Sequence, residues 1–120
     1  MGLNGEEYSK RLHNSKIAIC PHGNVSVETF RFYEAARSGC VIISPVLPNT
    51  QIYKNSSVVQ VENWHTDTGA IIMELINNHD KLANIQRNIA NDCNNTLCEK
   101  AAANRILSKL QHYYFYISVY

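Results

Sequence analysis

The spacing of hydrophobic residues changes about halfway along the chain. In the first half, apolar residues form short runs at 17–19, 40–43 and 58–61, the last interrupted by Gln60, and each is about as long as a β-strand. From residue 66 onwards they recur every three or four positions, as in amphipathic helices. The pattern predicts an α/β fold: a small Rossmann-like parallel sheet of about three strands, flanked by helices and followed by a helical C-terminal part.

The first two runs are joined by a helical segment. Residues 27–38 contain few helix-breaking residues and end at Gly39, the residue type favoured just after a helix. A strand, a helix and a second strand form a right-handed βαβ unit with parallel strands. Ligands of such units bind beyond the carboxyl ends of the strands, which here means the loop at residues 22–26. A receiver-like domain would have clustered acidic residues at the ends of these strands. Here the strands end at Cys20 and Ser44, which disfavours that class of domain.

Shorter elements complete the prediction. Residues 5–14 are expected to form a helix that Asn4 caps, with two glutamates in its first turn. Residues 45–57 contain two prolines and many polar residues, so they predict a long loop with one helical turn at 51–54. Asparagines interrupt the C-terminal apolar stripes at 91–95.

The helix after the first strand carries the candidate chemistry. Ser26 is placed to cap it, and its free amides and dipole favour a phosphate in front of it. Glu28, Arg31 and Glu34 follow at spacings of three; Arg31 can fork onto a phosphate, and Glu34 can accept two ribose hydroxyls. Alternatively, these charges pair with one another on a solvated face. Three apolar positions on a different side of the helix are expected to pack on the sheet: Phe30, Tyr33 and Ala36.

Composition and charge restrict the function. A net charge of +1 gives no electrostatic reason to expect nucleic acid as a partner. No apolar run approaches the roughly 20 residues of a membrane span, and the polar first residues do not resemble a signal peptide, so we expect a cytoplasmic protein. The cysteines lack the spacing of a metal site, and we expect four reduced, mostly buried thiols: Cys20, Cys40, Cys93 and Cys98.

The sequence from Pro21 to Ile43, PHGNVSVETFRFYEAARSGCVII, resembles the donor-site segment of GT-B glycosyltransferases. It is most similar to the exostosin-like pattern, in which a Pro-Arg-Gly loop precedes Ser-Phe-Arg-x-Trp/Tyr-Glu-Ala and a Gly-Cys pair before a strand. It resembles more distantly the Glu-x7-Glu segment of retaining, family 1-like enzymes. The resemblance covers residues 5–64 well and the helical remainder loosely.

This resemblance implies roles for particular residues. Glu34 would bind the ribose of a nucleotide-sugar, and Arg31 would lie near its diphosphate, with no metal ion or other cofactor. His22 stands where the exostosin-like loop often has arginine, and Ser26 stands where Glu-x7-Glu has its first glutamate. The resemblance therefore assigns neither the stereochemistry nor the general base. The donor-binding candidates are His22, Gly23, Asn24, Ser26, Glu28, Arg31, Glu34, Leu47, Asn49 and Tyr53.

Three of these candidates belong to the loop that follows the second strand: Leu47, Asn49 and Tyr53. In the similar enzymes this loop forms another wall of the donor pocket. Alternatively, the loop is only a structural connection between two strands, with Tyr53 packed underneath it.

GT-B enzymes react in a cleft between two Rossmann-like domains, and this chain resembles the later part of the second domain. We expect one partial Rossmann-like domain over 1–120, with a donor-site core at 5–64, a helical part at 66–112 and an aromatic, β-prone tail at 113–120. The domain would transfer a sugar as part of a glycosyltransferase. We expect it to act either as a homo-oligomer or together with an N-terminal domain that is missing here. The alternative is a non-catalytic module that binds nucleotide or serves assembly. The sugar and the acceptor are not indicated.

Overall fold

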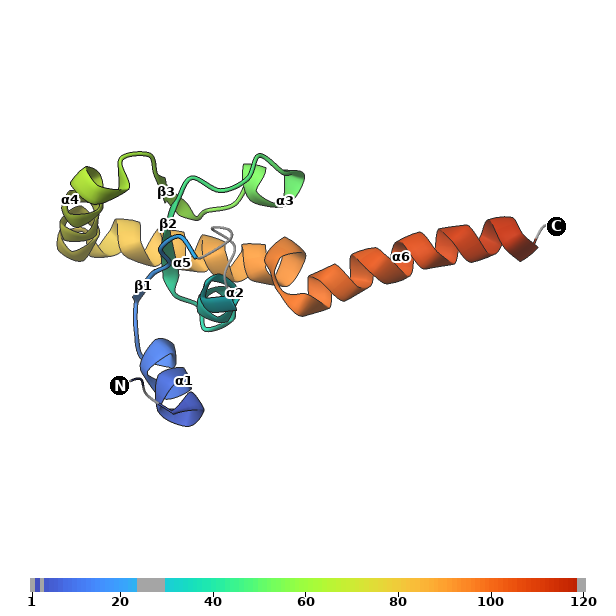
Figure 1. The fold of residues 1–120 in the computed structure, drawn as a ribbon, viewed down its shortest axis with the longest axis horizontal. Coiled ribbons are helices and arrows are strands. Elements are labelled where there is room, and N and C mark those ends of the chain that lie inside the picture. The colour runs from blue at the N-terminus through green and yellow to red at the C-terminus, as the bar shows by residue number, and fades with distance from the viewer. Residues whose placement is uncertain (1, 3, 24–29, 119–120) are drawn as a thin grey trace.

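The structure, a computed structural model, describes residues 2, 4–23 and 30–118, and of Phe30 and residues 112–118 only the backbone. A three-stranded parallel sheet lies at the end of the molecule opposite to α6, with helices packed around it (Figure 1). Its strands follow the order of the sequence: β1 (Ile17–Ile19), β2 (Val41–Pro45) and β3 (Val59–Val61). Ile17 pairs with Val41, and Ile43 pairs with Val59. The predicted small α/β fold with a parallel sheet is confirmed.

Helices surround the sheet and make up the C-terminal part. α2 connects β1 to β2, α3 lies in the loop between β2 and β3, and α5 crosses behind the sheet (Figure 1). The helical elements of the described residues are α1 (Gly5–His13), α2 (Phe30–Arg37), α3 (Gln51–Lys54), α4 (Trp64–Asn77), α5 (His79–Asp92), the π-helical turn η1 (Cys93–Leu97) and α6 (Glu99–Ser118).

The central strand β2 is buried on both faces. Successive strand residues point to opposite faces, so Ile42 packs with Phe32 of α2 and Ile89 of α5. Ile43 packs on the other face with Leu75 of α4. All five side chains are at most 1% exposed, and each contributes roughly 1.5–3 kcal/mol of transfer free energy. α2 therefore covers the Ile42 face of the sheet and α4 covers the Ile43 face, while α5 contributes Ile89 to the first cluster and Leu82 to the second.

The edge strand β1 differs from its prediction. Its length suggested a strand buried on both faces, but Ile19 is 46% exposed while Ala18 is buried. β1 has a single neighbouring strand, β2, among the described residues. An edge position leaves part of one face uncovered, which a short apolar run does not reveal.

The face of α2 that packs on the sheet was also predicted incorrectly. Phe32, Ala35 and Ala36 are buried, whereas Tyr33 is 38% exposed. Of the expected set, Ala36 is buried, and the side chain of Phe30 lies outside the described residues. The buried set has the i, i+3, i+4 spacing of one helix face, which allows the largest apolar ring to fill the space above β2.

Two predicted helix boundaries are confirmed. At the start of α1, Asn4 Oδ1 accepts the Glu7 N–H at 2.9 Å, and the Glu7 carboxylate accepts the Asn4 N–H at 3.4 Å. This reciprocal pair is a capping box. After α2, Gly39 adopts a φ of +76°, in the left-handed region where a side chain is strained.

The C-terminal helix α6 projects away from the sheet, and the molecule extends 60 × 31 × 31 Å (Figure 1). Residues 113–118 of the aromatic tail continue α6 as helix, although their side chains are β-prone. Three apolar side chains of α6 are 48–60% exposed: Ile106, Leu107 and Leu110. Among the described residues, no helix combines the length and apolar character needed to cross a membrane.

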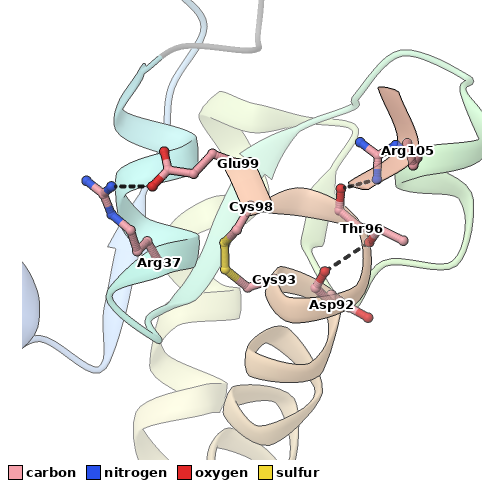
Figure 2. Close-up of a disulfide and its surroundings, with 7 residues drawn as sticks. All are labelled: Arg37, Asp92, Cys93, Thr96, Cys98, Glu99 and Arg105. Carbon is pink, nitrogen blue, oxygen red and sulfur yellow. Dashed lines mark hydrogen bonds and ion pairs between the residues drawn. A yellow bond between two sulfur atoms is a disulfide. The ribbon is translucent and has the colours of Figure 1, made fainter. Parts of the chain in front are cut away.

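Cys93 and Cys98 form a disulfide, which corrects the expectation of four reduced thiols (Figure 2). η1 brings the two residues together, with a Cα–Cα distance of 4.8 Å and a hydrogen bond of 3.0 Å from Cys98 N–H to the Cys93 carbonyl. Disulfides persist mainly in oxidising compartments, so this bond does not support the cytoplasmic location expected from the sequence. Cys20 and Cys40 are free and buried, as predicted.

Candidate functional site

The candidate site lies along α2. Because β1 and β2 are parallel, α2 begins on the side of the sheet where β1 ends and runs back towards the start of β2. That side is where ligands of open parallel sheets bind. Three candidates of the preceding loop lie outside the described residues: Asn24, Ser26 and Glu28.

Arg31 and Glu34 lie about one turn apart on α2, and neither belongs to an ion pair with a described residue. The ion pairs among the described side chains are Lys10–Glu6, Arg37–Glu99 and Lys81–Glu74. Arg31 is exposed and Glu34 half-buried. The alternative in which the helix charges neutralise one another is therefore not realised between these two residues.

The phenol of Tyr8, on α1, interacts with both charged side chains. Burial raises the pKa of Tyr8, and the hydrogen bond and negative charge of Glu34 raise it further, while Arg31 lowers it. α1 thus brings one neutral hydroxyl to the charged positions of α2. A neutral hydroxyl leaves the carboxylate charge of Glu34 uncompensated, which suits an acceptor of ligand hydroxyls.

Glu34 also lines an open cavity of about 190 Å³. Its other lining residues are Tyr33, Arg37, Cys98 and Glu99. Arg37 Nη1 donates to Glu99 Oε1 at 2.8 Å, so these two charges neutralise each other (Figure 2). Of the acidic side chains that line this cavity, Glu34 is the one that lacks a cationic partner among the described residues.

The loop candidates are placed differently from one another. Leu47 and Tyr53 are 6% and 3% exposed and belong to the core cluster beneath the loop. The Leu47 N–H donates to Gln60 Oε1 at 2.9 Å, which fixes the loop to β3. Asn49 is exposed. Tyr53 therefore lies as the structural alternative expects, packed underneath.

At the end of β1, His22 is exposed, and its Nδ1 lies 2.5 Å from the carbonyl oxygen of Gly23, which is half-buried. The imidazole thus contacts its own loop. The other ring nitrogen, Nε2, forms no hydrogen bond with a described residue, so it can accept or donate to a ligand.

Tyr33 joins this region to α3, a role that the sequence did not reveal. Its hydroxyl lies 2.6 Å from the Tyr53 hydroxyl. The Phe32 ring packs edge-on against both tyrosine rings, at centroid distances of 5.3 Å and 5.8 Å. Tyr33 and Glu99 also line a second cavity of about 290 Å³ between α2, α3, η1 and α6. The adjacent aromatic residues at 32 and 33 were the only sequence signal for this arrangement.

No group of three or more His, Cys, Asp or Glu side chains in the described part of the chain is arranged to hold a metal ion. Comparisons of the chain with family models, with curated proteins and with solved structures find no match.

Proposed function

We propose that this chain is the nucleotide-sugar donor-binding part of a GT-B glycosyltransferase. One observation carries the proposal. The crossover helix of the parallel β1–β2 pair bears Glu34 on the wall of an open cavity and Arg31 one turn nearer the helix start, and neither is neutralised by an ion pair with a described residue. The resemblance of residues 21–43 to the donor-site segment of these enzymes assigns the same two residues to the donor.

The spacing of the two residues suits one nucleotide. Arg31 and Glu34 are three residues apart, which corresponds to a rise of about 4.5 Å along the helix. This distance is comparable to the separation between the ribose and the diphosphate of a nucleotide. The two carboxylate oxygens of Glu34 accept hydrogen bonds from the vicinal hydroxyls of ribose. The guanidinium of Arg31 donates in a fork to the neighbouring diphosphate.

During transfer, the bond between the sugar's anomeric carbon and the diphosphate breaks, and a bond to an acceptor hydroxyl forms. Negative charge accumulates on the departing nucleoside diphosphate. Arg31 stabilises this charge, which makes departure possible without a metal ion at this helix. The acceptor and its base come from a second domain or a second copy of the chain.

A second candidate function is a non-catalytic assembly module. The observation in its favour is the half-exposed apolar side of α6 at Ile106, Leu107 and Leu110, which suits contact with another protein. The two functions differ in whether the chain binds a nucleotide.

Calorimetric titration with UDP, GDP, ADP and CMP, with and without Mg²⁺, tests the proposal. We expect saturable binding of one nucleotide, and Glu34→Ala should weaken it by about 1.5–3 kcal/mol, the contribution of hydrogen bonds to a charged group. Glu74→Gln removes an exposed carboxylate of α4 and is the matched control, with affinity unchanged. Unchanged affinity in Glu34→Ala contradicts the ribose contact. Absence of binding by every nucleotide contradicts the donor-binding function and favours assembly.

A further inference from the structure

The second cavity lies between elements that are distant in the sequence: α2, α3, η1 and α6. Its wall is largely apolar and consists of the Tyr33 ring, Ile52, Leu97 and the Ala102 methyl group. Tyr33 and Ile52 are 38% and 37% exposed, so their apolar surface remains open to this space. A volume of about 290 Å³ is near the lower end of ligand sites, which span roughly 300–1,000 Å³, and suits a ligand with one or two rings or a short chain.

Arg105 is the cationic side chain among the described residues that line this cavity. Arg105 Nη1 donates to the Thr96 carbonyl oxygen at 2.8 Å, which holds the guanidinium against η1 (Figure 2). No carboxylate of the described residues lies within ion-pair distance of Arg105. The acidic residue that lines the cavity, Glu99, is paired with Arg37 at 2.8 Å.

Within the described part of the chain, the rim therefore carries a single positive charge with unused N–H donors. Guanidinium has five N–H groups in a planar fork, and the Thr96 contact occupies one nitrogen. A planar carboxylate matches this fork and carries the one negative charge that balances it. A phosphate, with nearly two negative charges, would require further donors, and no second cationic side chain of the described residues lines the cavity.

We propose that this cavity binds a small organic acid, with its carboxylate on Arg105 and its apolar body between Tyr33, Ile52 and Leu97. The body is an aromatic ring system or a short alkyl chain. This site is separate from Glu34, and its occupation does not depend on the proposed nucleotide binding.

Protein NMR of the intact, oxidised chain tests this, using 1-naphthoate and octanoate as the two acids and 1-naphthalenemethanol as a neutral analogue. We expect saturable shifts at Tyr33, Leu97 and Ala102 with at least one acid, and the tighter acid identifies the ring or the chain as the preferred body. The neutral analogue should bind about fivefold to tenfold more weakly than naphthoate, because it lacks the charged hydrogen bonds.

Arg105→Gln should weaken binding of the acid by about the same factor and leave the neutral analogue unaffected. Lys109→Gln, one turn further along α6 and outside the cavity, is the matched control and should bind normally. Ala102→Leu fills the cavity and should weaken both probes. Shifts away from α2, α3, η1 and α6 in the variant spectra would reveal a folding defect instead. Absence of saturable shifts with both acids, equal affinity for acid and alcohol, or an equal loss in Lys109→Gln overturns the proposal.

Discussion

Replacing Phe32 tests how α2 is held on the sheet. Its ring is fully buried and packs edge-on against Tyr33 and Tyr53, at interplanar angles of 77° and 86°. Phe32→Ala should cost about 3–5 kcal/mol, the range for removing a buried aromatic ring. Phe32→Leu restores apolar volume but loses two aromatic pairs of about 0.5–1.5 kcal/mol each, so it should cost about 1–3 kcal/mol. A 120-residue domain has roughly 6–18 kcal/mol of stability at about 0.05–0.15 kcal/mol per residue, so the leucine variant should remain folded.

Urea unfolding followed by two probes measures these values. Far-UV circular dichroism reports the helices, and Trp64, the single tryptophan, reports the cluster on the opposite face of the sheet. Both midpoints should fall together if the two clusters unfold as one unit. Leu107→Ala removes a side chain that is 55% exposed and should change stability by less than about 0.5 kcal/mol. A loss below about 1.5 kcal/mol in Phe32→Ala, or an unchanged tryptophan midpoint, would refute this account of the core.

Two further predictions concern Cys20 and the glycines. Burial raises the pKa of Cys20 from 9.0 to about 11. The unfolded thiol therefore ionises first, so the free energy of unfolding is highest below pH 9 and falls by up to about 3 kcal/mol towards pH 11. Cys20→Ala should flatten this decline in urea unfolding performed within minutes of mixing, and an equal decline contradicts it. Gly39→Ala should lower stability by about 1–2 kcal/mol in thermal unfolding, because φ is +76° at this residue. Gly69→Ala, in open space within α4, should raise stability by up to about 1 kcal/mol. A stability change of the same sign in both variants contradicts the backbone argument.

Much of the fold follows from local sequence. Three short apolar runs predicted the parallel strands, because buried strands need no polar alternation. Asn4 and Glu7 have the spacing of a capping box, and residues 51–54 form the predicted helical turn. The rotation of α2 about its axis was not predictable, because apolar residues at 30, 32, 33, 35 and 36 satisfy more than one helical face. Packing against β2 decides between them.

The disulfide and the helical structure of residues 113–118 could not be predicted from the spacing of hydrophobic residues. Residues five apart on an α-helix differ by about 140° around its axis, so an uninterrupted helix would separate Cys93 from Cys98. The wider turn of η1 brings them together. Residues 113–118 are β-prone by type but continue α6. Once a helix has formed, each added residue gains a backbone hydrogen bond without a new nucleation cost.

Tyr33 shows how a wrong assignment and the two candidate sites are connected. The ring was expected beneath α2, yet it lies at the surface and lines both cavities. Its hydroxyl is held by Tyr53, and its ring is held by Phe32, so it cannot turn without disrupting buried contacts. The wall that separates Glu34 from the Arg105 cavity is therefore set by the core before any ligand arrives. A wall that is already ordered reduces the entropy cost of binding at either cavity.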